Sequence, residues 1–256
     1  MEDFDEELQQ PDRHGVLDIS HRAWATLDDQ IWQWCVQGSS LLVLNISFNE
    51  ISVIPAGIGV LVLMRELNAG NNVIEALPPE IGRCRALKKL KVNGNRLRTL
   101  PPDLSKCRAL EVLNASENLI EVVPPELSTL PALSILSLPN NRLQLLPNSL
   151  ADCHTLVDID VSNNPDLEMI PPPIRTNAQM ILWVCDRWRA HETETRELRE
   201  ANEDLEMLAK TQDDQKMRMK DEIKALKRER AAWQRERPER YIALKSSCRQ
   251  LCCTIM

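Results

Sequence analysis

Residues 87–95 read LKKLKVNGN, and residues 110–118 read LEVLNASEN. Both follow the pattern L-x-x-L-x-L-x-x-N, which allows other apolar residues at some of the leucine positions. The pattern occurs six times with a period of 23 residues, and its first position is occupied by Leu41, Met64, Leu87, Leu110, Leu133 and Leu156. Six units on one period indicate an array of structural repeats rather than a single compact core.

The centre of each unit places apolar residues at every second position, which is typical of a strand with one buried face. A lone strand cannot bury its apolar side, but successive strands stacked in a parallel sheet share a continuous core. The asparagine that ends each unit is expected to bond backbone groups that would otherwise be buried without partners. This predicted structural ladder consists of Asn49, Asn72, Asn95, Asn118, Asn141 and Asn164.

Each unit returns through an aliphatic residue followed by proline, as in Leu77-Pro78 and Leu100-Pro101. Proline fixes its own φ and disfavours helix at the residue before it, so we expect extended or 3-10 arms. Strand, asparagine turn and arm together make the leucine-rich repeat pattern. The predicted fold is an α/β solenoid, a leucine-rich repeat horseshoe with a parallel β-sheet on its concave face and extended or 3-10 arms on its convex face, followed by a long α-helix.

Glycine and proline are absent from residues 174–237, which are therefore predicted to be helical. The core is expected to be capped by Trp24, Trp32 and Trp34 at one end, and by Ile181, Trp183 or Val184, and Trp188 at the other. The expected organisation is an acidic disordered N-terminus (1–13), an N-terminal capping repeat (14–40), six repeats (41–177), a C-terminal cap and long charged helix (178–237), and a basic, cysteine-containing lipidated tail (238–256).

The predicted helix carries an apolar stripe and a polarised charge. The stripe follows a seven-residue grid that is compatible with a coiled coil and comprises Leu198, Leu205, Met219, Leu226 and Trp233. Residues 186–214 hold five basic and ten acidic side chains (net −5), and residues 215–249 hold twelve basic and five acidic (net +7). A single solvated helix, a hairpin and a dimer all fit these features, as does a basic end lying on an anionic surface.

The sequence ends in Cys253-Thr254-Ile255-Met256, which fits the C-a-a-X prenylation box, and methionine in the last place favours farnesyl. One isoprenoid anchors weakly, so we expect a second signal, either palmitoylation of Cys252 or Cys248 or anionic lipid bound by the basic tail. Ordinary reduced thiols are the alternative. No apolar run could span a membrane, and the first residues contain no secretory signal. We therefore expect a cytoplasmic protein, peripheral at the cytoplasmic face of a membrane.

Residues that alternate with the buried leucines are expected on the concave side, where solenoids usually bind partners. An apolar row flanked by three lysines would suit a protein partner with an acidic patch. A solvated strand face also carries mixed charge, so an ordinary solvated surface remains an alternative. The candidate partner-binding residues are Phe48, Arg65, Glu66, Lys88, Lys89, Lys91, Val112 and Ile135.

Motifs for catalysis or cofactor binding, such as G-x-S-x-G, H-E-x-x-H or a glycine-rich phosphate loop, are not found in the sequence. We therefore expect no enzyme activity, no cofactor and no metal site. The net charge of −7 argues against nucleic acid as a partner of the whole chain. Cys84, Cys107 and Cys153 share one repeat position and are expected to be small core residues.

The arm sequences ALPPEIG (76–82), TLPPDLS (99–105) and VVPPELS (122–128) resemble those of the intracellular Ras-group leucine-rich repeat proteins, which include the Sur/Shoc-type scaffolds. That resemblance implies a scaffold for small GTPases or phosphatases. The leading hypothesis is therefore a non-catalytic adaptor in intracellular signalling that is tethered to a membrane. The alternatives are a self-associating structural protein at a cytoskeletal or flagellar membrane, and a targeting subunit of a phosphatase or ubiquitin ligase.

Overall fold

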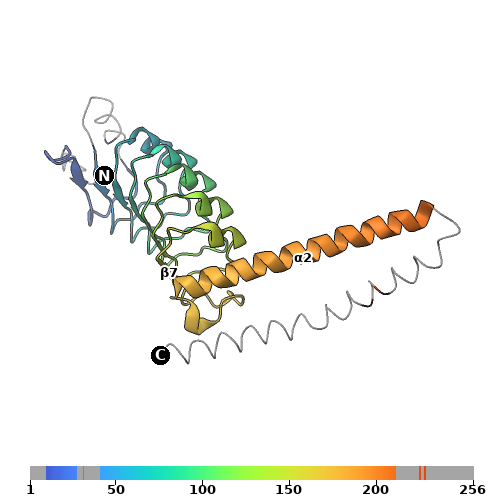
Figure 1. Ribbon diagram of the computed structural model, residues 1–256. Helices are drawn as coiled ribbons and strands as arrows, with labels where there is room; N and C mark the ends of the chain where they lie inside the picture. Colours follow the sequence, from blue (N-terminus) through green and yellow to red (C-terminus); the bar gives the residue numbers. More distant parts are fainter. Residues whose placement is uncertain (1–9, 28–30, 32–40, 212–224, 226–227, 229–256) are drawn as a thin grey trace. The chain divides into compact units, whose positions relative to one another are not determined.

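The computed structural model describes residues 10–27, 31, 41–211, 225 and 228. Within this part of the chain, seven parallel strands of three residues each form a single sheet in the order of the sequence (Figure 1). They are β1 (Val16–Asp18), β2 (Val43–Asn45), β3 (Glu66–Asn68), β4 (Lys89–Lys91), β5 (Val112–Asn114), β6 (Ile135–Ser137) and β7 (Asp158–Asp160). The structure therefore confirms the predicted solenoid sheet.

The register of the sheet follows the period of the sequence. Each strand pairs its middle residue with the middle residue of the next, so Leu44, Leu67 and Leu90 are Cα partners in succession. All three side chains are fully buried. Burying a leucine contributes roughly 1.5–3 kcal/mol, and here the burial is provided by the neighbouring repeats.

Short 3-10 helices form the opposite side of the repeats (Figure 1). The proline before each helix has a φ near its fixed value, for example −69° at Pro78. The turn then closes when the N–H of the following residue donates back into it, as Cys84 does to Ile81. These predicted arms are η1 (Ala56–Val60), η2 (Pro79–Arg83), η3 (Pro102–Lys106), η4 (Pro125–Thr129), η5 (Asn148–Asp152) and η6 (Pro172–Ile174).

A long helix, α2 (Ala178–Thr211), follows the array. The chain divides into two units, residues 1–185 and 186–256, and the first turns of α2 belong to the first unit. In that unit Ile181 and Val184 are buried whereas Trp183 is exposed, so Val184 rather than Trp183 contributes to the cap. Most of the predicted continuation of the helix beyond residue 211 lies outside the described residues, as do Trp32 and Trp34.

The carboxyl-terminal edge of the sheet is closed by a buried arginine. The carbonyl of Arg175 accepts a hydrogen bond from the N–H of Val161 (2.8 Å), where a further strand would otherwise pair. Arg175 is 8% exposed, and its guanidinium donates to three backbone carbonyls, those of Asn164 (2.6 Å), Leu167 (2.6 Å) and Ile170 (2.9 Å). This contact satisfies buried acceptors and covers an edge that could otherwise pair with another chain.

Candidate functional site: the exposed face of the sheet

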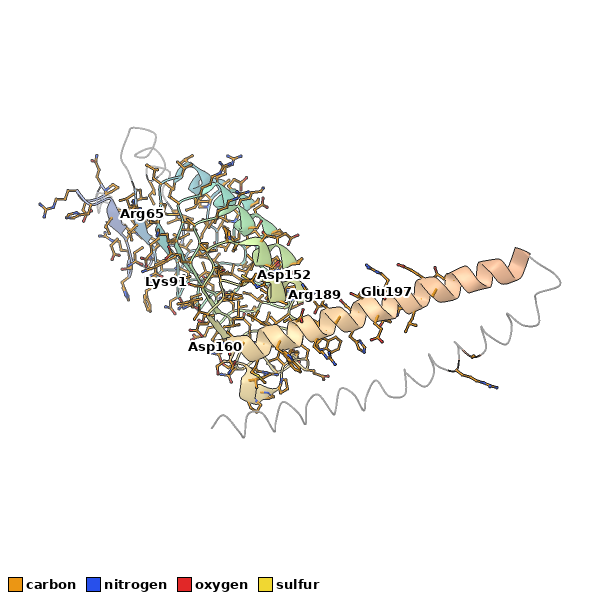
Figure 2. All side chains as sticks on the ribbon, in the orientation of Figure 1. Arg65, Lys91, Asp152, Asp160, Arg189 and Glu197 are labelled. Carbon is orange, nitrogen blue, oxygen red and sulfur yellow. The ribbon has the colours of Figure 1, made fainter. Side chains whose placement is uncertain are left out.

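The exposed side of the sheet, called the sheet face below, carries three rows of side chains, because the strands pair in register. The first row precedes the strands and contains Arg65, Lys88, Glu111, Ser134 and Val157. The central row contains Val43, Glu66, Lys89, Val112, Ile135 and Asp158. The third row contains Asn45, Asn68, Lys91, Asn114, Ser137 and Asp160. Figure 2 shows Arg65, Lys91 and Asp160 in order across the strands of the sheet.

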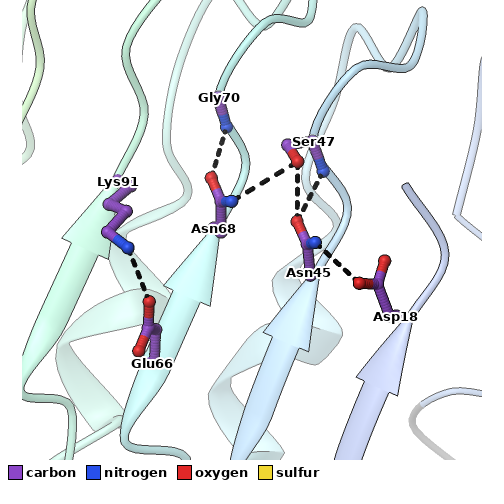
Figure 3. A network of polar contacts seen from close by, with 7 residues as sticks. All are labelled: Asp18, Asn45, Ser47, Glu66, Asn68, Gly70 and Lys91. Carbon is purple, nitrogen blue, oxygen red and sulfur yellow. Dashed lines mark hydrogen bonds and ion pairs between the residues drawn. The ribbon is translucent and has the colours of Figure 1, made fainter. Parts of the chain in front are cut away.

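Two of the three candidate lysines are already neutralised within the sheet face. Lys88 Nζ lies 2.7 Å from Glu111 Oε1. Lys91 Nζ lies 2.8 Å from Glu66 Oε1, as Figure 3 shows. Pairs with this much exposure contribute at most about 1 kcal/mol each, so they arrange charge more than they stabilise the fold. The predicted basic cluster therefore carries less uncompensated charge than its three lysines suggest.

Other charges on the face remain without an ion pair among the described residues. Among the described residues, the cations without an ion pair include Arg65, next to β3, and Lys89 in β4. The carboxylate of Asp158 in β7 also has no ion pair there. Between Lys89 and Asp158 lie Val112, which is half-buried, and Ile135, which is 36% exposed. From β4 to β7, the central row therefore presents a cation, two apolar side chains and a carboxylate.

Polar groups at the amino-terminal end of the face are bonded to one another (Figure 3). Asn45 Nδ2 donates to Asp18 Oδ2 (3.0 Å), and Ser47 Oγ donates to Asn45 Oδ1 (2.7 Å). Asn68 Nδ2 in turn donates to Ser47 Oγ (3.4 Å). Partial burial raises the pKa of Asp18, but hydrogen bonds from Ser20 and Asn45 outweigh it and hold the pKa below its ordinary value. These groups already have partners, so the strands from β4 to β7 are the better candidate for binding.

Phe48 lies outside the three rows, in the loop after β2. Its side chain is 51% exposed and stacks on His21, with ring centroids 4.4 Å apart and planes 9° from parallel. Its φ of +56° is a left-handed value, which costs a residue with a Cβ roughly 1–2 kcal/mol. The equivalent position is asparagine or glycine at Asn71, Gly94, Asn140 and Asn163, but it is Glu117 in one repeat, also with a positive φ. The structure thus brings the other seven candidates together on the sheet and leaves Phe48 in a loop.

The ladder asparagines bond the backbone and serve the fold. Asn118 Nδ2 donates to the carbonyls of Val92 (2.9 Å), Ala115 (3.2 Å) and Ser116 (2.9 Å). Its Oδ1 accepts a hydrogen bond from the N–H of Leu97 (3.0 Å). Each amide therefore ties its own turn to the preceding repeat, and equivalent bonds are made by Asn49, Asn72, Asn95, Asn141 and Asn164.

The repeat cysteines Cys84, Cys107 and Cys153 are buried. Burial raises the pKa of Cys84 to about 12 and that of Cys107 to about 11, so both remain thiols at neutral pH. Their Sγ–H groups donate to the carbonyls of Ile58 (3.3 Å) and Ile81 (3.2 Å) in the preceding repeats. In the part of the chain that the structure describes, no group of three or more His, Cys, Asp or Glu residues could hold a metal ion.

A second exposed apolar row, which we did not predict, runs along the arms of the repeats. Thr99, Val122 and Leu145 form successive parallel β-bridges, and the last two are exposed. Val53 is exposed at the equivalent position of the first full repeat. The signal for this arm row was present in the sequence, because its members share the 23-residue period of the leucines. Substitutions in this arm row can therefore serve as controls for the same substitutions on the sheet face.

The predicted membrane-binding tail is not covered by the structure. Cys248, Cys252 and Cys253 lie outside the described residues, and so does most of the basic segment 215–249. Among the helices in the described ranges, none combines the length and the apolar character that a membrane span requires. In α2, Leu198 of the predicted coiled-coil stripe is exposed.

Comparison with known proteins identifies the repeat class. Residues 85–143 match the leucine-rich repeat family. The chain is similar to the leucine-rich repeat protein LIC12759 of Leptospira interrogans, with 28% identity and a TM-score of 0.53 over 56% of this chain and 35% of that one. It is also similar to the leucine-rich repeat ectodomain of the plant membrane receptor kinase GASSHO1/SCHENGEN3 from Arabidopsis thaliana, solved in complex with CASPARIAN STRIP INTEGRITY FACTOR 2, with 32% identity and a TM-score of 0.43 over 48% of this chain and 16% of that one.

The chain thus spans only 35% of the length of the Leptospira protein. No curated protein matches the chain. The family match covers the middle of the array, and the parallel sheet with its 3-10 arms extends the same architecture to both sides of it. Residues 16–174 of this chain therefore form a leucine-rich repeat domain.

Proposed function

We propose that this chain is a non-catalytic scaffold that binds a protein partner through its sheet face. Leucine-rich repeat arrays generally bind proteins, on the extended surface that stacked repeats create. The observation that supports this face is the central row, where Lys89, Val112, Ile135 and Asp158 lie on adjacent strands. A partner can bury the apolar pair and neutralise charges that have no ion pair among the described residues.

Glutamate at Val112 and Ile135, the apolar positions between Lys89 and Asp158 in the central row, is expected to weaken partner binding. The Val112→Glu/Ile135→Glu variant should lose at least about tenfold in affinity, because two carboxylates would stand where the complex buries apolar surface. Partners would be identified by crosslinking and affinity capture with the full chain, and the dissociation constant of each would then be measured by titration of the purified proteins.

The matched control is Val122→Glu/Leu145→Glu, which makes the same substitutions on adjacent repeats of the arm row. It should bind the partner as the wild-type chain does, and both variants should keep the wild-type circular dichroism spectrum. Loss of binding in the control alone would move the binding surface to the arm row. Full binding by the Val112→Glu/Ile135→Glu variant would show that the sheet face is not used.

We further propose that the C-a-a-X motif, Cys253-Thr254-Ile255-Met256, tethers the scaffold to a membrane. Farnesylation of Cys253 would supply one signal. Palmitoylation of Cys252 or Cys248, or contact of the basic tail with anionic lipid, would supply the second signal that stable attachment needs. The net charge of residues 215–249, twelve basic against five acidic side chains, supports the electrostatic part of this proposal.

Cys253→Ser is expected to release the protein from membranes of eukaryotic cells, because the thiol is the only atom that can take the isoprenoid in this box. The measurement is membrane fractionation combined with metabolic labelling by an isoprenoid analogue. Met256→Leu serves as the control, since it should exchange farnesyl for geranylgeranyl and keep the protein on membranes. Equal solubility of the wild-type chain and Cys253→Ser would refute the tether.

The resemblance of the arm sequences to Ras-group repeat proteins supports a signalling protein as the partner. An adaptor of this kind would bring a small GTPase or a phosphatase to the cytoplasmic face of a membrane. The sheet face would hold the partner, and the helix after the array would separate it from the lipid anchor.

A further inference from the structure

We propose that the partner segment bound by the sheet face is an amphipathic α-helix that crosses strands β4 to β7, with an acidic residue over Lys89 and a basic residue over Asp158. This inference rests on the proposed function of the sheet face. It starts from the register of the sheet, in which Lys89, Val112, Ile135 and Asp158 are successive Cα partners on four adjacent strands.

The spacing of the central row matches one face of a helix. Adjacent strands lie about 4.8 Å apart, so Val112, Ile135 and Asp158 lie roughly 5, 10 and 14 Å from Lys89 along the row. A helix rises 1.5 Å per residue, so its positions 1, 4, 8 and 11, which share one face, lie at about 0, 4.5, 10.5 and 15 Å. In an extended segment, residues that share a face are about 6.6 Å apart, compared with about 4.8 Å between strands. By the third strand, such residues would no longer lie over the side chains of the central row.

The charges give the bound helix a direction. Lys88 and Lys91 are occupied by Glu111 and Glu66, so Lys89 is the lysine of β4 that an incoming carboxylate would meet. An acidic residue in the first turn of a helix and a basic residue in the last are also favoured by the helix dipole. The complementary segment therefore reads E-x-x-h-x-x-x-h-x-x-K, where h is a large apolar residue. The amino terminus of this helix lies over β4.

A second copy of this chain would be a weaker occupant of the same surface. Two sheet faces related by a twofold axis could also pair Lys89 of one copy with Asp158 of the other. However, between Lys89 and Asp158 each face would contribute only two apolar side chains, the half-buried Val112 and Ile135, while a standard interface buries about 800 Å² per partner. A helix needs only two apolar anchors to fit the same row.

The test is selection of displayed helical peptides on the full chain. The peptides have 14 residues, carry leucine at positions 4 and 8, and have positions 1 and 11 randomised among glutamate, glutamine and lysine. The wild-type chain should enrich glutamate at position 1 with lysine at position 11 over the exchanged order by about tenfold, as two partly exposed ion pairs would give. The Lys89→Glu/Asp158→Lys variant should invert this preference.

The matched control is Arg108→Glu/Glu126→Lys, which exchanges two exposed charges on the arms and leaves the sheet face unchanged. It should enrich the same peptides as the wild-type chain. Three results would overturn the inference: no enriched peptide, equal enrichment of both orders, or no inversion in the Lys89→Glu/Asp158→Lys variant. Loss of a dimer in that variant, measured by sedimentation, would assign the face to a second copy instead.

The peptide experiment separates this inference from the proposed function. If the Val112→Glu/Ile135→Glu variant loses the partner while charge order has no effect on peptide selection, the sheet face binds a partner that is not the inferred helix. If that variant keeps the partner, the sheet face itself is excluded as the partner site, whatever the peptides show.

Discussion

An Asn118→Ala variant is expected to unfold with a free energy about 4 kcal/mol below that of the wild-type chain. The substitution removes three hydrogen bonds donated to the carbonyls of Val92, Ala115 and Ser116, and one accepted from the N–H of Leu97. Asn118 is buried, so the freed backbone groups would have little access to water. Each unmade bond of this kind costs roughly 1 kcal/mol.

The substitution should also reduce the cooperativity of unfolding. Asn118 joins its own turn to the preceding repeat, and the stability of a repeat array depends on such contacts between neighbours. Urea unfolding followed by circular dichroism should therefore show a lower midpoint and a broader transition. The control is Asn93→Ala: among the described residues the Asn93 side chain makes no hydrogen bond, and the bonds donated by the Asn71 N–H and by Asn95 Nδ2 go to its backbone carbonyl, which alanine keeps. Equal midpoints for the two variants would mean that the ladder does not stabilise the array.

Much of the fold follows from the period. A residue and the residue 23 positions later stand on adjacent strands, so the burial of Leu67 and Leu90 could be predicted from the pattern alone. The same rule places Glu66 opposite Lys89. It does not predict that Glu66 bonds Lys91 diagonally, because that choice depends on side-chain rotamers. The rows of the sheet face were predictable for this reason, whereas its free charges were not.

Features that occur once in the chain were harder to predict. Arg175 has no counterpart at other repeats, so nothing in the period indicates that it closes the sheet. Whether Trp183 or Val184 is buried depends on which side of α2 faces the core. The sequence does not determine this orientation. Phe48 takes a left-handed φ at a position that four other repeats fill with asparagine or glycine and one fills with Glu117, so its residue type did not indicate the turn.

Arg175→Met is expected to lower the free energy of unfolding by about 4 kcal/mol, since hydrogen bonds from a charged group are the stronger kind. Methionine has similar length and would fill the space, but it donates nothing to the carbonyls of Asn164, Leu167 and Ile170. Arg175→Lys should recover only part of the loss, because one ammonium cannot reproduce the planar fork that reaches three acceptors. Urea unfolding of the three proteins gives these differences directly.

Hydrogen exchange would show whether the loss begins at the carboxyl-terminal edge. The N–H of Val161 donates to the carbonyl of Arg175, and the N–H of Leu167 donates within the loop that the guanidinium holds. Both amides should exchange faster in Arg175→Met, while the N–H of Val92 in the middle of the sheet should remain protected. Arg108→Met, at an exposed arginine, should leave all three unchanged. Uniform loss of protection along the sheet would contradict a role confined to the cap and would instead mean that the array unfolds as one cooperative unit.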